Sequence, residues 1–119
     1  MSTGMQTMIL VLCTFPDWEQ ARQIGTVLVE RQLVACVNLL PGVESIYRWN
    51  GQVEQAAEVL AVFKTASELF PALAEALAAL HPYEVPEIVA LQPAAVSEAY
   101  LAWLLAAVAV TVTREGVNQ

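Results

Sequence analysis

The sequence predicts an α+β protein in which two helices cover one face of an antiparallel sheet. Strand-like and helix-like segments follow one another along the 119 residues in the order β-α-β-β-α-β, and one more helical pattern comes after them. An Asn50-Gly51 dipeptide between two strand-like segments marks a tight hairpin. No linker rich in Pro, Gly or Ser divides the chain. We therefore expect one domain over residues 8–107, between an N-terminal tail (1–7) and a C-terminal tail (108–119).

The first strand and the first helix are predicted within residues 8–32. Residues 8–15 are a continuous apolar run that ends before Pro16, as is typical of a strand buried on both faces. Asp17 followed by Gln20 has the spacing of a capping box, so a helix is expected over 17–32. Its buried stripe is expected to consist of Ala21, Ile24, Gly25 and Leu28.

The middle of the chain predicts an unusually long hairpin. Residues 35–40 form a second apolar strand, Pro41-Gly42 interrupts it, and residues 43–49 then alternate between two faces. The return strand is expected over 52–65, because Asn50-Gly51 readily adopts the two positive φ angles of a type I′ turn. Arms of this length predict that part of the hairpin projects beyond its own domain.

Two helices and one strand are predicted in the second half. Ser67 is expected to cap the second helix, Pro82 to end it, and Ser97 to cap the last helix. The buried positions expected on these two helices are Leu69, Leu73, Ala76, Leu77 and Leu80, then Tyr100, Leu101, Leu104 and Leu105. A fourth strand is expected over 87–92. The resulting βαββαβ order is that of a ferredoxin-like sandwich with an added C-terminal helix.

The composition indicates an oligomer with no nucleic-acid or membrane partner. Hydrophobic residues make up 57% of the chain and charged residues only 14%, so one copy has little polar surface to cover its core. The formal charge is −7 and there is no basic run, which argues against binding to phosphate backbones or anionic membranes. The longest apolar run, residues 99–110, is too short to span a bilayer.

A cytoplasmic location is expected from the N-terminal segment and the cysteine content. No Lys or Arg precedes the apolar residues 8–13, which argues against a signal peptide. Cys13 and Cys36 are too few for a disulfide scaffold, so both are expected to be free thiols.

Short segments spread from about residue 8 to residue 105 together resemble a known family. The segments are Cys13-Thr14, Pro16-Asp17, Ala35-Cys36-Val37-Asn38, Pro41-Gly42, Ser45-Ile46-Tyr47-Arg48-Trp49, Gly51, Lys64-Thr65, His81-Pro82-Tyr83, Pro86-Glu87-Ile88 and Tyr100-Leu101 with Trp103. In this order they resemble the CutA divalent-cation tolerance proteins. The resemblance implies a ferredoxin-like protomer, a cytosolic homotrimer, a role in copper or divalent-metal tolerance, and no established catalytic activity.

The resemblance also implies a metal site at Cys13 and His81. Some members of the family have two consecutive histidines at this place, whereas this chain has Leu80 before its single histidine. A thiolate and an imidazole suit Cu²⁺ and other divalent cations. The residues themselves leave structural roles open. Cys13 lies in an apolar strand where a free cysteine often only packs, and a histidine at a helix C-terminus interacts favourably with the helix carbonyls.

A ligand cleft between subunits is the remaining candidate site. Lys64 is the only lysine and Tyr83 follows the helix-ending Pro82, so both are candidates to line such a cleft, and His81 is expected to face it. Trp49 and Trp103 are expected at subunit contacts, whereas Glu54, Glu58, Glu84 and Glu87 are expected to be solvated.

Two other functions stay open. One is a signalling or anchoring trimer that binds a small anionic metabolite or a partner protein, and the other is an enzyme of unrecognised activity.

Overall fold

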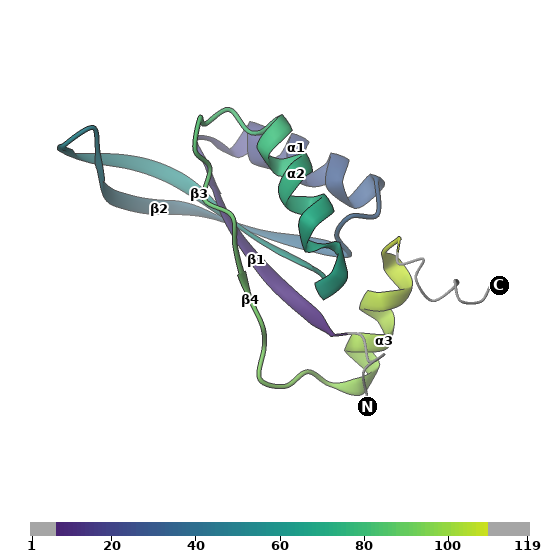
Figure 1. The fold of residues 1–119 in the computed structure, drawn as a ribbon. Helices are drawn as coiled ribbons and strands as arrows, with labels where there is room; N and C mark the ends of the chain where they lie inside the picture. The colour runs from purple at the N-terminus through teal and green to yellow at the C-terminus, as the bar shows by residue number, and fades with distance from the viewer. Residues whose placement is uncertain (1–6, 110–119) are drawn as a thin grey trace.

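The computed structural model describes residues 7–109 and confirms the α+β architecture. The elements are β1 (Met8–Phe15), α1 (Trp18–Glu30), β2 (Cys36–Trp49), β3 (Gln52–Ala66), a 3₁₀ turn (Ser67–Leu69), α2 (Phe70–Leu80), β4 (Val89–Leu91) and α3 (Glu98–Ala107). The strands form one antiparallel sheet in the order β2-β3-β1-β4, the order of a split βαβ sandwich. Helices α1 and α2 lie side by side on one face of this sheet (Figure 1). Of the predicted tails, 1–7 and 108–119, residues 1–6 and 110–119 lie outside the described residues.

The main core lies between the sheet and these two helices. Alternate residues of β1 point into it, among them Val11, Cys13 and Phe15, and each of these three side chains is fully buried. From α1, the four residues of the predicted stripe are all buried, which confirms the helical periodicity expected there. Leu73 and Leu77 of α2 complete this core.

The first helix begins and ends as its sequence dictates, although it is shorter than predicted. The carboxylate of Asp17 accepts a hydrogen bond from the backbone N–H of Gln20 at 2.8 Å, which confirms Asp17 as the helix cap. The side-chain amide of Gln20 donates to the same carboxylate at 2.9 Å, whereas a capping box would have it bond to the backbone N–H of Asp17. The helix ends at Glu30 because Gln32 adopts a φ of 60° and the N–H of Leu33 bonds to the carbonyl of Leu28 at 3.0 Å. This Schellman-type ending explains why residues 31 and 32 are not helical.

Two predicted boundaries in the second half are wrong. Ser67 does not cap a helix, because it begins the 3₁₀ turn and its hydroxyl donates to the carbonyl of Thr7 at 3.0 Å instead. The α-helix starts only at Phe70, with Pro71 in its first turn. The fourth strand is three residues long rather than six, since it pairs only with residues 10–12 of β1. Ser97 does cap α3, accepting from the N–H of Tyr100 at 3.2 Å.

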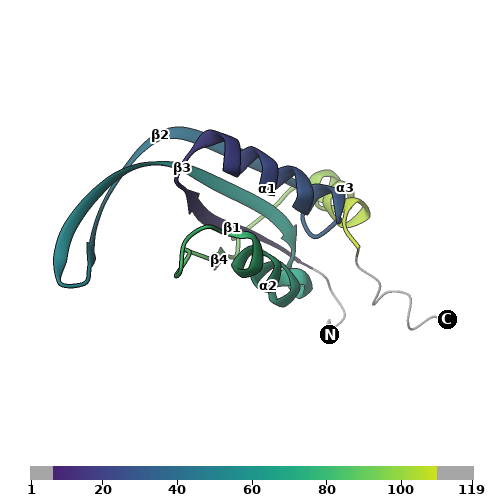
Figure 2. The ribbon, with the colours of Figure 1, turned by 90° about the horizontal axis from the view of Figure 1, so that it is seen from above.

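The long hairpin projects from the sheet as predicted. Its arms stay paired from Cys36↔Lys64 to Trp49↔Gln52, with one irregularity between Leu40 and Val43. Positive φ angles at Asn50 (51°) and Gly51 (77°) confirm the type I′ turn at the tip. Figure 2 shows the hairpin curving away from the body of the sheet, which contributes to the extents of 52 × 27 × 24 Å.

The second face of the sheet, which we call the open face, is covered only at one end. There α3 packs on it through a small apolar cluster that includes Met8, Ala66 and Leu104. Farther along the face, Leu40, Val89 and Leu91 are each about half exposed (45%, 45% and 46%). The open face therefore keeps exposed apolar side chains within the described residues of a single chain. In the part of the chain that the structure describes, no helix is long and apolar enough to cross a membrane.

Candidate functional site

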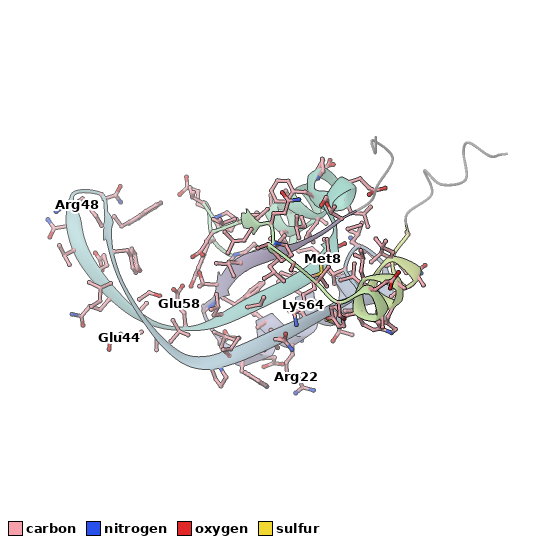
Figure 3. All side chains as sticks on the ribbon, turned by 90° about the horizontal axis from the view of Figure 1, so that it is seen from below. Met8, Arg22, Glu44, Arg48, Glu58 and Lys64 are labelled. Atoms are coloured by element: carbon pink, nitrogen blue, oxygen red, sulfur yellow. The ribbon has the colours of Figure 1, made fainter. Side chains whose placement is uncertain are left out.

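A cavity of about 700 Å³ lies between the curved hairpin and the loop that follows α2. It is lined by Thr14, Ser45, Ile46, Tyr47, Trp49, Glu58, Pro82, Tyr83, Glu84, Val85 and Glu87. The register of the hairpin explains part of this set: Val43 pairs with Glu58, so Ser45, Tyr47 and Trp49 follow on the same face at two-residue spacing. Figure 3 shows Glu58 near the place where the hairpin leaves the sheet.

A hydrogen bond between Tyr83 and Glu58 joins the two walls of the cavity. The Tyr83 hydroxyl donates to Oε2 of Glu58 at 2.5 Å, and the Glu58 side chain is only 9% exposed. Burial, together with the hydrogen bond and charge of Glu58, raises the pKa of Tyr83. Tyr83 is therefore a neutral donor at physiological pH.

His81 lies behind this wall rather than on the surface of the cavity. Its Nε2–H donates to the carbonyl of Thr14 at 2.7 Å, its Nδ1 accepts from the N–H of Tyr83 at 3.1 Å, and its ring stacks on Phe15 with centroids 4.5 Å apart. Burial lowers the pKa of His81, which favours the neutral ring with its proton on Nε2. Pro82 and Tyr83 line the cavity of the single chain, whereas His81 does not. The imidazole of His81 instead holds the backbone of Tyr83 through its Nδ1.

Cys13 and His81 both lie beside the carbonyl oxygen of Thr14. The Cys13 side chain is fully buried, and its Sγ lies 4.0 Å from the same oxygen that accepts from His81. Burial, followed by the charges of Glu87 and Glu58, raises the pKa of the Cys13 thiol to about 12. Within residues 7–109, no group of three or more His, Cys, Asp or Glu side chains is arranged to hold a metal ion.

Lys64 and Tyr83 do not share a cleft within one chain. Lys64 pairs with Leu10 and Cys36 near the α3 end of the open face, and its Nζ lies 5.9 Å from the centroid of the Tyr100 ring. The hydroxyl of Tyr100 is 3.6 Å from Sγ of Cys36. These residues form a separate cluster beside α3, and Lys64 is not among the residues that line the cavity.

The role of Glu58 is not predicted by the sequence. We expected this side chain to be solvated, and the structure corrects that expectation, because Glu58 is buried at the base of the hairpin under Tyr83. A weak signal was available. Glu58 is the only acid directly before the apolar residues 59–63 of the return strand, where the hairpin rejoins the domain.

Comparison with known proteins gives one consistent family. The CutA1 divalent ion tolerance protein family matches residues 9–107. The divalent-cation tolerance protein CutA of Thermus thermophilus is 53% identical over 95 residues, which is 80% of this chain and 92% of that protein. Protein CutA of Mus musculus is 45% identical over 91 residues, or 76% of this chain and 51% of that protein. This chain thus spans about half the length of the mouse relative.

Solved structures agree with the sequence comparison. The divalent cation tolerance protein Cut A1 from Thermus thermophilus superposes with a TM-score of 0.84 at 48% identity, covering 87% of this chain and all of that one. The periplasmic divalent cation tolerance protein CutA from Archaeoglobus fulgidus gives 0.80 at 33% identity, covering 82% of this chain and 95% of that one.

The expected cytoplasmic location is wrong as a deduction from this sequence. The Archaeoglobus fulgidus relative is described as periplasmic, and a relative in Arabidopsis thaliana that is 41% identical over 96 residues (81% of this chain, 53% of that protein) is named as chloroplastic. The same domain therefore occurs in different compartments. Membership of this family therefore does not determine the compartment.

Proposed function

Because this chain belongs to the CutA1 family of divalent ion tolerance proteins, we propose that it is a non-enzymatic homotrimer that binds Cu²⁺ weakly at Cys13 and His81. The observation that carries the metal proposal is the meeting of Cys13 Sγ and His81 Nε2 at the carbonyl oxygen of Thr14. A thiolate and an imidazole together are a suitable donor pair for Cu²⁺ and other divalent cations.

The geometry supports weak binding. Both ring nitrogens of His81 are engaged in hydrogen bonds, so a metal must displace Thr14 or Tyr83 before it can use a lone pair. Cys13 must also lose a proton although burial raises its pKa to about 12. Leu80 offers no further ligand, and water or groups of a neighbouring subunit would have to complete the coordination. Each of these requirements reduces the affinity.

The homotrimer is supported by the exposed apolar residues of the open face. Half-exposed Leu40, Val89 and Leu91 form a surface that a second copy can cover, as the low charge content of the chain demands. The second candidate is a signalling or anchoring trimer, for which the cavity offers a concave surface to hold a ligand. The charged residues that line the cavity are acids, which does not suit the anionic metabolite considered above.

Calorimetric titration with Cu²⁺ tests the metal proposal. We expect Cys13→Ser and His81→Ala each to weaken binding by about tenfold or more, and the double variant to be hardly worse than either, because the two residues act as one site. Affinity should also fall as the pH is lowered. The metal must displace a proton from the Cys13 thiol at every pH below about 12, and it also competes with protonation of the imidazole below the lowered pKa of His81. Cys36→Ser is the matched control, since it removes the other free thiol. Unchanged binding in all variants, or an equal loss in Cys36→Ser, would refute the site.

A further inference from the structure

We propose that Cys36 and Lys64 form a site of reversible oxidative modification, in which hydrogen peroxide converts the Cys36 thiol to a sulfenic acid that then condenses with the Lys64 amine. The site is the group of Cys36, Lys64 and Tyr100, which we call the α3 cluster. It uses neither Cys13 nor His81 of the proposed metal site. It also needs no surface of the hairpin tip, because Cys36 and Lys64 form the pair at the opposite end of the β2–β3 ladder.

The α3 cluster lies beneath a helix of its own chain. Cys36 is directly opposite Lys64 in the β2–β3 ladder, and Lys64 is opposite Leu10 in the β3–β1 ladder. Leu10 packs in the apolar cluster below α3, so the three side chains face the end of the sheet that α3 covers, where Figure 3 shows Lys64 (Figure 3). The site therefore uses none of the exposed open-face residues that a second copy can cover. Cys36 is half-buried on the edge strand β2, which leaves its sulfur within reach of a small oxidant.

The two cysteines of the chain have opposite surroundings. Cys13 is fully buried, and the charges that act on it are those of carboxylates. Sγ of Cys36 instead lies 3.6 Å from the hydroxyl oxygen of Tyr100 and directly across the strands from Lys64, the only lysine of the chain. Nζ of Lys64 lies 5.9 Å from the centroid of the same tyrosine ring, so the sulfur and the ammonium group meet at one side chain. A partly exposed thiol beside a cation is the kind that oxidants modify, whereas burial among carboxylates protects a thiol.

The first step is attack of the Cys36 sulfur on hydrogen peroxide. The thiol gives its proton to water, a sulfur–oxygen bond forms, the O–O bond breaks, and the leaving hydroxide takes up a proton. The sulfur is thereby oxidised by two electrons, and the products are a sulfenic acid and water. The ammonium group of Lys64 lies where it can stabilise the leaving hydroxide. The hydrogen bond with Cys36, followed by burial, raises the pKa of Tyr100, so its hydroxyl stays protonated and is a donor in the site.

The second step joins Lys64 to the oxidised sulfur. After the ammonium group loses a proton to solvent, its nitrogen attacks the sulfur of the sulfenic acid. A sulfur–nitrogen bond forms, and the sulfenic hydroxyl leaves with one amine hydrogen as water. Residues directly opposite each other in an antiparallel ladder have Cβ atoms about 5 Å apart, a gap that a lysine side chain can cross. The product is a sulfenamide between β2 and β3, which an added thiol cleaves back to the free thiol and amine.

Peptide mass spectrometry of the full-length protein, treated with hydrogen peroxide in its native assembly, tests the proposal. After denaturation and blocking of the remaining free thiols, a protease that cleaves after glutamate separates the residues of interest. Cys36 then lies in the peptide 31–44, Lys64 in the peptide 59–68, and Cys13 in a peptide that ends at residue 19. We expect the first two peptides to be linked, with a mass two hydrogens below their sum. Dithiothreitol should release both.

Conservative variants separate the roles of the three side chains. Lys64→Arg keeps a cation but removes the primary amine, so the linked peptides should disappear and dimedone should trap the sulfenic acid of Cys36 instead. Tyr100→Phe keeps the ring and removes only the hydroxyl, and we expect it to slow the loss of the Cys36 thiol about fivefold. Tyr83→Phe is the matched control, because it removes a tyrosine hydroxyl from the loop after α2, and the rate should stay within about twofold. Cys13→Ser should give the same linked peptides as the parent protein.

The proposal is wrong if Cys36 of the parent protein keeps its thiol under peroxide treatment that oxidises free glutathione. Faster oxidation of Cys13 than of Cys36 would show that the α3 cluster does not select the reactive thiol. A parent protein in which Cys36 stops at the sulfenic acid, or forms a disulfide with a second chain, would show that Lys64 is out of reach. Linked peptides that persist in Lys64→Arg would assign the bond to a different group.

Discussion

His81, the only histidine of the chain, connects three parts of the fold. Its ring stacks on Phe15, its Nε2–H donates to Thr14, and its Nδ1 accepts from Tyr83. The ring therefore fixes the start of the loop that forms one wall of the cavity. The family resemblance marks His81 as a metal ligand. In this chain, His81 also links β1 to that loop.

His81→Ala should lower the stability without preventing folding. The change leaves the carbonyl of Thr14 and the N–H of Tyr83 without their partner and removes the stacking on Phe15. We expect a loss of about 2–4 kcal/mol in the free energy of unfolding, measured with chemical denaturant. His81→Gln, which can restore one of the two hydrogen bonds, should lose less. A loss below about 0.5 kcal/mol in His81→Ala would show that the ring has no structural role.

Cys13 should make the protein less stable in alkaline solution. Burial raises the pKa of this thiol from 9.0 to about 12 in the folded state, so above pH 9 the unfolded chain releases a proton that the folded chain retains. The stabilising contribution is complete below pH 9 and is lost as the pH rises through 12. The free energy of unfolding should fall less steeply between pH 9 and about pH 10.5 in Cys13→Ala than in the parent protein or in Cys36→Ala. Equal slopes in all three would contradict the burial of the Cys13 thiol.

At the scale of elements, local patterns predicted well what short-range chemistry determines. The helix cap at Asp17 and the turn at Asn50-Gly51 depend on neighbours within a few residues, and both are observed. Ser67 was misassigned because its hydroxyl bonds to Thr7, a residue 60 positions earlier. The candidate site likewise has one part that the sequence predicts and one that it does not. The approach of Cys13 and His81 followed from the family pattern, whereas the burial of Glu58 depends on a contact with Tyr83 that no local pattern encodes.

The irregularity in β2 yields a prediction for Gly42. This residue adopts a φ of 77° where the hairpin register shifts, and an added Cβ would meet no atom within 4 Å. The cost of Gly42→Ala should therefore come from the backbone alone, about 1 kcal/mol in the free energy of unfolding. Gly42→Asn should cost less, because asparagine tolerates this conformation better. Equal costs for both substitutions would show that steric contacts, rather than φ, determine the requirement for glycine.

At the scale of the whole molecule, a single chain has more apolar residues than its core can bury, and the surplus lies on the open face and the hairpin. The two helices bury one face of the sheet, and α3 covers only an end of the other. The exposed apolar residues of the open face and of the hairpin are then available for contacts between copies. The proposed trimer would cover the open face, and this face continues into the concave side of the hairpin, because Glu58 and Leu60 lie on the same face of β3.

Assembly through the open face can be tested with one charge added on its edge strand, β4. Val89 is 45% exposed and pairs with Leu12, so Val89→Glu places a carboxylate on the apolar surface without removing buried contacts of the main core. In the proposed homotrimer this charge would be buried without a partner, and sedimentation velocity at micromolar concentration should show loss of the trimer in favour of smaller or unfolded species. Val29→Glu is the matched control, because Val29 is 38% exposed on α1, away from the open face, and the same change there should leave the trimer intact. A parent protein that sediments as a folded single chain would refute the homotrimer. A trimer that survives Val89→Glu would place its interface elsewhere on the molecule.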